Sequence, residues 1–374
     1  MATEAIQTER DAFVERIIGA IGGTIDMYSI YLGDTLGFYR TLAEAGPQTT
    51  HNLAATTDTH ERYVREWCEQ QTVTGILAVD DPAAPADRRR YSLPEPHVEV
   101  LTDQESLNFL APFAQMIAGL AAPIEQVAEA YRTGGGVSYA DYGHDAHEGV
   151  ARGNRASFLH LLGQEWLPAI PDVDTSLRQL DARIADIGCG HGYSAIGMAR
   201  SYPTVTVDGF DLDAASVAAA RDTVAEAGLE DRVTIHQGDA ADLATEEFGE
   251  YDLVTAFECV HDMSDPVAAL RTMRQLAGDD GTVIVMDERA GDSFADPSDI
   301  EALLYGFSIL HCLPVGMADQ PSVATGTVMR TDTFEEYATE AGFGAVEVLP
   351  IENFFWRFYR LYPGESPDST GGSP

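Results

Sequence analysis

The chain has 374 residues, 45% of them hydrophobic and 9% aromatic, which is typical of a globular protein and excludes a disordered one. The chain is longer than the chains that usually fold around a single hydrophobic core, so two domains are expected. The 61 acidic residues face only 22 basic ones, and the net charge of −39 would repel nucleic acids and anionic lipids.

All 22 basic residues are arginine, and the acidic residues are spread along the whole chain. Concentrated salt screens the self-repulsion of such a surface, so we expect a protein of a halophilic cytoplasm. An acidic mesophilic enzyme is the alternative, and it explains the absence of lysine less well. The first residues, MATEAIQTERD, have no positive or apolar signal region, and no apolar run approaches the roughly 18 residues that span a bilayer.

The four cysteines lie far apart and form no Cys-x-x-Cys pair: Cys68, Cys189, Cys259 and Cys312. This spacing favours buried thiols in a reducing compartment, which agrees with a cytoplasmic location.

A long amphipathic helix is predicted over residues 10–45. Its apolar residues recur every three or four positions, as Phe13, Ile17, Ile21, Ile25 and Tyr28. This face is more apolar than one small domain needs, and contiguous apolar surface usually marks an interface. We therefore expect a homodimer that forms through the N-terminal domain.

The next segment has the order of elements of a winged helix: helix, turn, helix, strand, wing, strand. Two short helical patterns are separated by TTDTH (residues 56–60) and are followed by the strand pattern GILAV (75–79). A polar turn that ends in Arg88, Arg89 and Arg90 precedes a second strand pattern, YSLP (91–94).

A winged helix raises the possibility of DNA binding. The second helix, however, carries three acids against two arginines, whereas a recognition helix normally offers positive charge to phosphates. The three consecutive arginines on the wing are the only basic run. We prefer a dimerisation and lid module that contacts no nucleic acid.

Residues 101–175 are predicted to be helical and irregular, forming a linker and a lid over an acceptor pocket. Glycines 134–136 interrupt this region like a hinge, and a helix over 155–171 is stopped by prolines. The string GHDAHE contains four residues of types that bind metals: His144, Asp145, His147 and Glu148. A metal site needs a closed set of ligands, and the sequence shows no further well-placed ligand for these residues. We expect a polar loop or an exposed helix start there, and no metal.

From residue 181 onward, strand and helix patterns alternate, which is typical of a doubly wound parallel sheet. The strand patterns cover 182–188, 204–212, 233–239, 251–258 and 281–288, and two closing strands cover 345–352 and 353–362. The predicted fold class is α/β, a Rossmann-like sheet that is mostly parallel with an antiparallel closing strand, after an N-terminal all-α/winged-helix domain.

The turn after the first of these strands is rich in glycine. Asp186 is followed by Gly188, Gly190 and Gly192. Glycines let the backbone approach a ligand closely, and the following helix start presents unpaired N–H groups. A dinucleotide fingerprint has the spacing G-x-G-x-x-G; the spacing G-x-G-x-G after an acid favours a ligand with a carboxylate and a ribose but no pyrophosphate.

Acidic residues end the next two strands. Asp211 can accept both hydroxyls of a ribose, and Asp239 can accept a hydrogen bond from an exocyclic adenine amine. Together with the glycine turn, these acids are expected to meet at the carboxyl ends of the strands, where open α/β sheets bind ligands.

With these motifs, residues 180–361 resemble the class I S-adenosylmethionine-dependent methyltransferases. The resemblance implies that Asp186 and the three glycines lie against the methionine part of the cofactor. It implies that Asp211 and Leu212 contact the ribose of the cofactor and that Asp239 and Ala240 contact its adenine. Phe257 would lie beside the sulfonium. The layout of the whole chain is similar to that of small-molecule O-methyltransferases, which dimerise through their N-terminal domains.

The sequence ECVHDMSDP sharpens this resemblance. Plant O-methyltransferases have a similar His-Asp after the fourth strand, where the histidine is the general base, so the resemblance implies this role for His261. Asp287 matches the acid that orients the histidine, and Asp262 stands at a helix start, where a carboxylate is favoured. The further acid of the family falls at about Met329 and is missing, so a packing role for His261 stays open.

The predicted function is methyl transfer from S-adenosylmethionine to a small-molecule hydroxyl. The expected domains are 1–100 for dimerisation, 101–175 for the linker and lid, 176–361 for methyl transfer, and 362–374 as a disordered tail. The segments YADYG (139–143) and FSILHCLPVG (307–316) line the acceptor pocket or belong to the core. Two alternatives remain: a winged-helix regulator that binds the cofactor without turnover, and an inactive dimeric scaffold.

Overall fold

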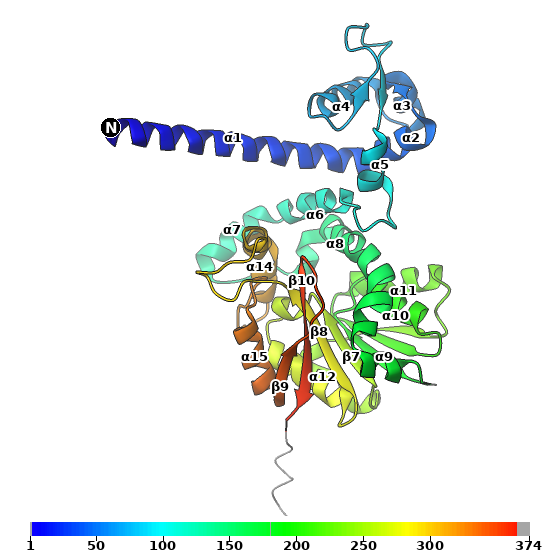
Figure 1. Cartoon of the computed structure of the whole chain (residues 1–374), viewed down its shortest axis with the longest axis vertical. Helices are drawn as coiled ribbons and strands as arrows, with labels where there is room; N and C mark the ends of the chain where they lie inside the picture. The colour runs from blue at the N-terminus through cyan, green and yellow to red at the C-terminus, as the bar shows by residue number, and fades with distance from the viewer. Residues whose placement is uncertain (1, 180, 365–374) are drawn as a thin grey trace, which may run out of the picture. The chain divides into compact units, whose positions relative to one another are not determined.

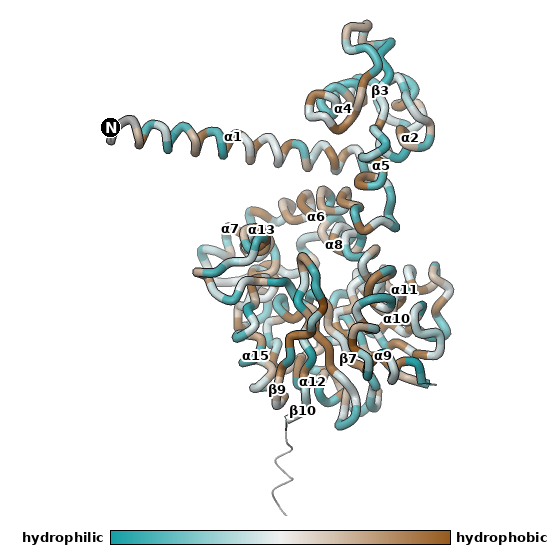
Figure 2. Tube along the Cα trace, viewed as in Figure 1, coloured by the Kyte–Doolittle hydropathy of each residue, from teal (hydrophilic) through white to brown (hydrophobic). Residues whose placement is uncertain are grey.

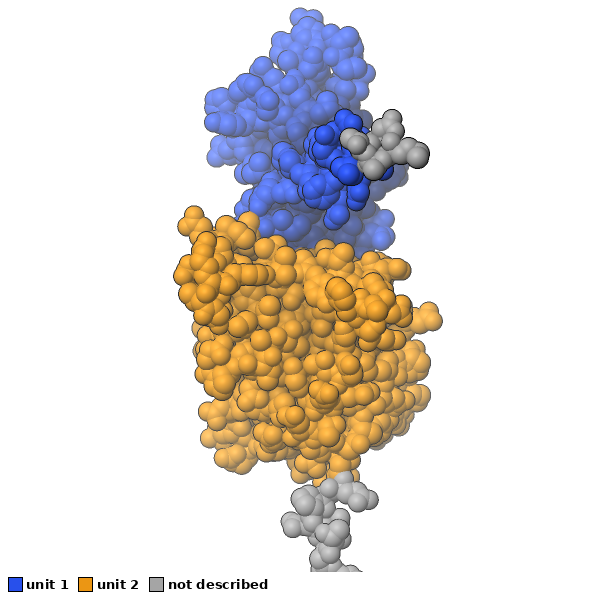
Figure 3. Space-filling model, turned by 90° about the vertical axis from the view of Figure 1, so that its left-hand side faces the viewer, with its two compact units in different colours: residues 1–119, 144–156 blue, residues 120–143, 157–374 orange. Residues whose placement is uncertain are grey.

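The computed structural model of the chain describes residues 2–179 and 181–364. It has two compact units, coloured blue and orange in Figure 3. The winged-helix unit comprises residues 1–119 and 144–156, and the sheet unit comprises residues 120–143 and 157–374. The expected linker 101–175 is therefore divided between the two units.

The N-terminal region forms two helices, where the sequence pattern predicted one. Helix α1 (Ala2–Thr35) is separated from α2 (Phe38–Ala45) by Gly37, whose φ of 71° favours glycine. Apolar residues recur along α1 (Figure 2), and the predicted face from Phe13 to Tyr28 is exposed in the single chain.

A winged helix follows, as predicted. Its helices are α3 (Thr50–Thr56) and α4 (Glu61–Val73), and its strands are β1 (Gln48–Thr49), β2 (Ala78–Val79) and β3 (Arg90–Ser92). The strands form an antiparallel sheet in the order β1-β3-β2, and the two-residue β1 was not predicted. Buried side chains such as Leu53, Val64 and Tyr91 form its core.

Three more helices belong wholly or mainly to this unit: α5 (Glu95–Thr102), α6 (Ala111–Ala121) and α8 (Gly143–Ser157). Helices α6 and α8 approach closely because a Cβ on Gly119 would lie 2.1 Å from the backbone nitrogen of Ala146. An ion pair of 2.8 Å between Arg152 and Asp34 connects α8 to α1.

The sheet unit contains seven strands in the order β6-β5-β4-β7-β8-β10-β9. Figure 1 labels four of them, β7, β8, β9 and β10. Their bounds are β4 (Arg183–Ile187), β5 (Thr206–Asp211), β6 (Val233–Gln237), β7 (Leu253–Phe257), β8 (Thr282–Glu288), β9 (Phe343–Val348) and β10 (Trp356–Pro363). The first five are parallel, and β10 runs antiparallel between β8 and β9. The predicted sheet is therefore confirmed.

Helices cover both faces of this sheet. Alternate residues of β8 show why: Ile284 and Met286 belong to one buried core, and Val283 and Val285 belong to the other. The first core includes η2 (Phe158–Trp166), α9 (Pro171–Leu177), α10 (Tyr193–Ser201) and α11 (Ala214–Glu226). The second core includes α12 (Pro266–Ala277) and α15 (Thr331–Glu340).

The remaining elements of the sheet unit are α7 (Ile124–Thr133), α13 (Glu301–Phe307), α14 (Leu313–Gly316) and short η segments. The helix predicted over 155–171 winds as a π-helix in η2, and Gly163 brings it against Ser201 at the end of α10. None of the described helices has both the length and the apolarity to cross a membrane.

The end of the chain differs from the expected boundary. Strand β10 continues to Pro363, so residues 362 and 363 belong to the sheet and not to a tail. Residues 365–374 of the expected tail lie outside the described residues.

Candidate functional site

The predicted site residues lie at the carboxyl ends of the parallel strands. We call this side of the sheet the carboxyl edge. Strands β4 and β7 are neighbours, and the chain order reverses between them, because β5 and β6 follow on one side and β8 on the other. Open α/β sheets bind ligands at such a reversal. The glycine turn follows β4, and the segment that carries His261 follows β7.

The glycine turn has the conformation that its glycines favour. Gly188, Gly190 and Gly192 have φ values of 67°, 51° and 80°, all in the left-handed region. A Cβ on Gly188 would lie 2.6 Å from the Cys259 sulfur, whereas the space beside Gly190 is open. A backbone with open space at this position can approach a ligand.

Asp211 holds the glycine turn in place. Its Oδ2 accepts a hydrogen bond from the Gly190 nitrogen at 2.8 Å, and its Oδ1 accepts one from the Asp213 nitrogen at 2.9 Å. Each carboxylate oxygen has a further lone pair for a ligand hydroxyl. The next residue, Leu212, is 58% exposed and offers an apolar side chain at this edge.

Asp186 lies beneath the turn and is completely buried. It accepts hydrogen bonds from Ser194 at 2.5 Å and from Thr255 at 2.8 Å. Burial raises its pKa to about 6, although these hydrogen bonds favour the charged form. The side chain thus joins β4 to the start of α10 and to β7, which positions the turn from below.

The other expected cofactor residues are near the same edge. Asp239 is exposed after β6, and its Oδ1 accepts a hydrogen bond from the Ala241 nitrogen at 2.8 Å. Ala240 is half-buried against the second core. Phe257, the last residue of β7, is buried, with its ring centroid 5.7 Å from that of Phe158.

His261 is buried among three carboxylates, which we call the His261 cluster. Its Nδ1 lies 2.6 Å from Asp287 Oδ1 and 2.9 Å from Glu288 Oε2, and its Nε2 lies 3.2 Å from Asp262 Oδ1. Of the three acids around His261, the sequence had named two, Asp262 and Asp287.

The charges of this cluster are unbalanced. Burial lowers the pKa of His261, but the carboxylates of Asp287, Glu288 and Asp262 outweigh burial and hold the pKa well above its ordinary value. Burial and the neighbouring Asp287 raise the pKa of Glu288. Asp287 Oδ2 is buried with no hydrogen bond, whereas the buried oxygens Glu288 Oε2 and Asp262 Oδ1 lie beside the ring nitrogens of His261. A cationic group beside the cluster would compensate this surplus of negative charge.

Glu288 was missed by the sequence prediction. Side chains alternate along a strand, so the neighbour of Asp287 is expected on the opposite face. Glu288, however, is the last residue of β8, where this alternation ends. It supplies a third carboxylate, whereas Met329, the position of the family's acid, is buried in the second core.

The two segments that were expected to line an acceptor pocket or to belong to the core lie together. The rings of Tyr139 and Tyr142 contact that of His311, with centroids 5.7 and 4.6 Å apart. The Tyr142 hydroxyl donates to the Leu310 carbonyl at 2.7 Å. The sulfur of Cys312, the next residue, lies within 4.8 Å of ligand-type atoms of His261 and Asp262, so this pair of segments reaches the His261 cluster.

The string GHDAHE forms the first turns of α8, so it starts a helix as one of the two expectations had it, but this start is not wholly exposed, because His147 is buried and Asp145 is half-buried. Asp145 accepts hydrogen bonds from Tyr31 at 2.9 Å and from Gln115 at 3.0 Å. Among the described residues, the groups close enough to share a metal ion are both centred on His261, and neither contains a residue of this string.

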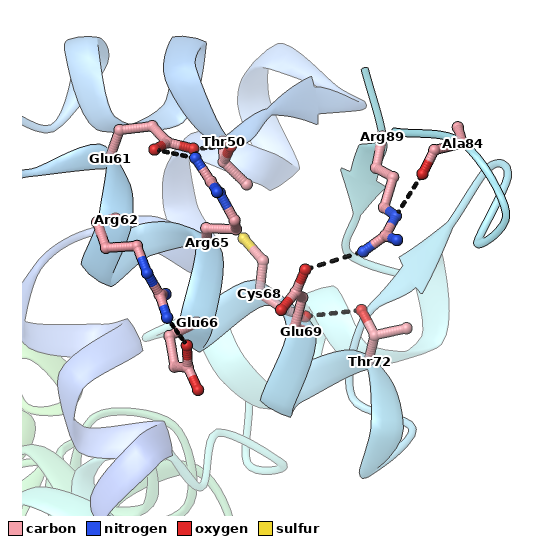
Figure 4. Close-up of polar contacts among 10 residues, drawn as sticks. All are labelled: Thr50, Glu61, Arg62, Arg65, Glu66, Cys68, Glu69, Thr72, Ala84 and Arg89. Atoms are coloured by element: carbon pink, nitrogen blue, oxygen red, sulfur yellow. Dashed lines mark hydrogen bonds and ion pairs between the residues drawn. The ribbon is translucent and has the colours of Figure 1, made fainter. Parts of the chain in front are cut away.

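Three arginines of the winged helix, Arg62, Arg65 and Arg89, are paired with acids, as Figure 4 shows. Arg62 and Arg65 on α4 pair with Glu66 and Glu61 at 2.5 and 2.6 Å. Arg89 on the wing pairs with Glu69 at 2.8 Å and also donates to the Ala84 carbonyl. These guanidinium groups are already neutralised by carboxylates, which disfavours phosphate binding by this surface.

Comparisons with known proteins agree with this fold. Residues 184–281 match the family model described as "Methyltransferase domain", and residues 26–103 match the model "Rv2258c-like winged HTH domain". Both models match where the sequence motifs predicted the corresponding domain. The class I S-adenosylmethionine-dependent methyltransferase fold with an N-terminal winged helix is thus confirmed, and S-adenosylmethionine is the cofactor of this class.

Curated relatives align over part of the chain. Ajmaline N-methyltransferase of Rauvolfia serpentina is 28% identical over 171 residues, which are 43% of this chain and 57% of that protein. Ubiquinone biosynthesis O-methyltransferase of Escherichia coli O6:H1 is 29% identical over 188 residues, 49% of this chain and 71% of that protein. The chain thus spans little more than half the length of the ajmaline enzyme.

Solved structures share the fold over nearly the whole chain. Mitomycin 7-O-methyltransferase MmcR has a TM-score of 0.70 at 21% identity, covering 96% of this chain and all of that one. Human N-acetylserotonin methyltransferase, solved with S-adenosylmethionine, has a TM-score of 0.69 at 16% identity, covering 94% and 98%.

Proposed function

Since the chain carries a methyltransferase domain of the S-adenosylmethionine-dependent class, we propose that it methylates a hydroxyl oxygen of a small molecule. The observation that carries this proposal is the His261 cluster, which stands after β7 beside the glycine turn. The names of two relatives, a ubiquinone biosynthesis O-methyltransferase and a mitomycin 7-O-methyltransferase, support oxygen as the acceptor atom.

The residues of the carboxyl edge fit this cofactor. The open space beside Gly190 admits the methionine part, and Asp211 with Leu212 suits the ribose. Asp239 and Ala240 would hold the adenine, and Phe257 would flank the sulfur. When bound, S-adenosylmethionine supplies a methyl group on a positively charged sulfur, which is already activated for transfer.

The protein's own task is then to align the acceptor and remove its proton. We assign the general base to His261, with Nδ1 held by Asp287 and Nε2 directed toward Asp262. In the resting cluster the raised pKa keeps a proton on the imidazole. A positive charge placed beside Asp262 would lower that pKa and return His261 to the neutral form that accepts a proton.

The test is transfer of label from methyl-labelled S-adenosylmethionine to small molecules of a cell extract, at high salt. The proposal predicts labelled acceptors whose methyl group is released under conditions that cleave aryl or alkyl methyl ethers. Binding of S-adenosylhomocysteine without any labelled acceptor would favour the inactive scaffold.

A regulator that binds the cofactor without turnover is the second candidate, because the N-terminal unit is a winged helix. The paired arginines of α4 and the wing speak against it. A band shift with genomic DNA fragments that survives molar salt would favour the regulator over the enzyme.

We also propose a homodimer formed through α1. Large apolar side chains along this helix are exposed in the single chain: Ile6, Phe13, Val14, Ile17, Ile18, Ile21, Ile25, Tyr28 and Leu32. A helix of 34 residues with this much apolar surface is stabilised by a second copy. Light scattering at high salt is expected to give twice the chain mass, and a clean monomer would contradict the dimer.

The setting we propose is a salt-rich cytoplasm. The net charge of −39 and the absence of lysine support the salt, and the four free cysteines support a reducing compartment.

A further inference from the structure

A histidine, an acid and a cysteine meet at the carboxyl edge, next to the proposed base. Ligand-type atoms of His261, Asp262 and Cys312 all lie within 4.8 Å of one another. His261 and Cys312 are buried, whereas the side chain of Asp262 is 22% exposed. A small ion can therefore enter from the side of Asp262.

The chain holds Cys312 in this position from both sides. Before it, the Leu310 carbonyl accepts a hydrogen bond from the Tyr142 hydroxyl at 2.7 Å. After it, Gly316 packs against the segment of the proposed base, because a Cβ there would lie 3.2 Å from the Asp262 carbonyl oxygen. The cysteine is thus fixed beside His261 by the packing of α14 and its neighbours.

The imidazole of His261 is oriented as in a metal-binding histidine. Its Nδ1 lies 2.6 Å from Asp287 Oδ1 and 2.9 Å from Glu288 Oε2. A histidine that binds a metal nearly always has its other ring nitrogen held by such a partner. Nε2, 3.2 Å from Asp262 Oδ1, is then the nitrogen that faces an ion. Asp287 Oδ2 is buried with no hydrogen bond, so this cluster has negative charge that a cation would compensate.

The spacing of these atoms suits a tetrahedral zinc ion. Zn²⁺ binds nitrogen and oxygen at about 2.0–2.2 Å and sulfur at about 2.3 Å, so neighbouring ligand atoms stand about 3.3–3.6 Å apart. The 3.2 Å between His261 Nε2 and Asp262 Oδ1 is close to this value. Cys312 completes the set with a shift of its sulfur on the order of 1 Å. Thiolate and imidazole favour Zn²⁺, whereas Mg²⁺ prefers a shell of oxygens.

We propose that His261 Nε2, Asp262 Oδ1 and Cys312 Sγ bind a zinc ion, and that this ion inhibits the enzyme. Zn²⁺ binds the thiolate and the neutral imidazole, and the displaced protons pass to the solvent. The ion then occupies the nitrogen that would take the proton of the acceptor, so methyl transfer stops until the ion leaves. The inhibition rests on the proposed function, whereas the binding site does not.

Calorimetric titration of the full chain with zinc chloride, at high salt and with excess Mg²⁺ to occupy surface acids, tests the site. We expect one Zn²⁺ per chain, and Cys312→Ala is expected to weaken its binding at least about 10-fold. Cys68→Ala is the matched control, because Cys68 is equally a buried thiol but lies in the core of the winged helix. It is expected to keep the zinc affinity of the wild type. Equal zinc affinities for the two variants would overturn the proposal.

Cobalt(II) provides a second measurement that needs no variant of the cluster. It accepts the same ligands as zinc and gives a strong near-ultraviolet absorption when a thiolate binds it. We expect this absorption in the folded wild type and in Cys68→Ala. Its absence from the folded wild type would overturn the site even where Cys312→Ala fails to fold.

The inhibition is tested separately, by adding zinc and then a chelator to a methyl-transfer assay of the wild type. We expect zinc to stop the transfer and the chelator to restore it. Binding of zinc without inhibition would overturn the inhibitory role. A zinc-free protein that transfers no methyl group would instead overturn the proposed function and leave the zinc site standing, so the failures are distinguishable.

Discussion

The winged helix and the carboxyl edge of the sheet use acidic residues in opposite ways. On α4 and the wing, Arg62, Arg65 and Arg89 each pair with a glutamate, and the Arg62–Glu66 pair is largely exposed. In the His261 cluster, three carboxylates surround one imidazole, and Asp287 Oδ2 is buried with no hydrogen bond. Each of these three guanidinium groups thus has its own carboxylate partner, whereas one imidazole faces three acids in the His261 cluster.

This difference indicates which region takes a charged ligand. A polyanion such as DNA would have to displace the acids from the arginines of the winged helix. A cation would meet uncompensated carboxylates at the carboxyl edge, where a sulfonium is the proposed ligand group. Each of the following predictions tests one side of this comparison.

The largest effect is expected from His261→Ala. Loss of a general base costs on the order of 10² to 10⁴ in rate, while the affinity for S-adenosylhomocysteine stays near that of the wild type. Steady-state rates with an identified acceptor, together with calorimetry, check both parts. A decrease of tenfold or less would return His261 to a packing role.

A smaller effect is expected from Asp211→Ala. Losing a charge-assisted hydrogen bond costs about 2 kcal/mol, or about 30-fold in affinity for S-adenosylhomocysteine. Asp222→Ala is the control, since Asp222 lies exposed on α11 and its removal changes the net charge equally. Calorimetry that finds the same affinity for both variants would show that Asp211 holds no ribose.

The pH dependence of the rate tests the unbalanced charge itself. Only neutral His261 accepts a proton, so kcat/KM is expected to rise with pH through the raised pKa of the imidazole, above its ordinary 6.5. Asp287→Asn removes the carboxylate that raises this pKa most, and the rise should therefore move to lower pH. An unchanged profile would mean that another group titrates.

The smallest effect is expected on the balanced side. Arg62→Ala removes an i,i+4 ion pair whose side chains are 59% and 68% exposed. Such pairs contribute under about 0.5 kcal/mol, and high salt weakens them further. Urea unfolding should therefore give a free energy close to that of the wild type, with cofactor binding unaffected. A large loss of stability would show that the surface pairs do more than balance charge.

The sheet could be predicted because its signals are local. The alternation of strand and helix patterns, the glycine turn and the acids at strand ends each depend on a few neighbouring residues, and their order gives the parallel topology. The break at Gly37 was missed because the apolar periodicity continues through it. The two-residue strand β1 is too short to show a pattern.

The candidate site was predicted less completely, because its geometry depends on residues far apart in sequence. Tyr139 and His311 meet only through the packing of two helical segments, which no local pattern reveals. Glu288 joins the cluster because β8 ends there. The division of residues 101–175 between two units likewise follows from the contact of α6 with α8.

The central claim is that the carboxyl edge binds S-adenosylmethionine and its product. Isothermal titration of the folded wild-type protein with S-adenosylhomocysteine, in concentrated salt, tests it most directly. We expect saturable binding of one ligand per chain, which Asp211→Ala weakens and Arg62→Ala does not. Absence of binding by a protein shown to be folded would contradict it.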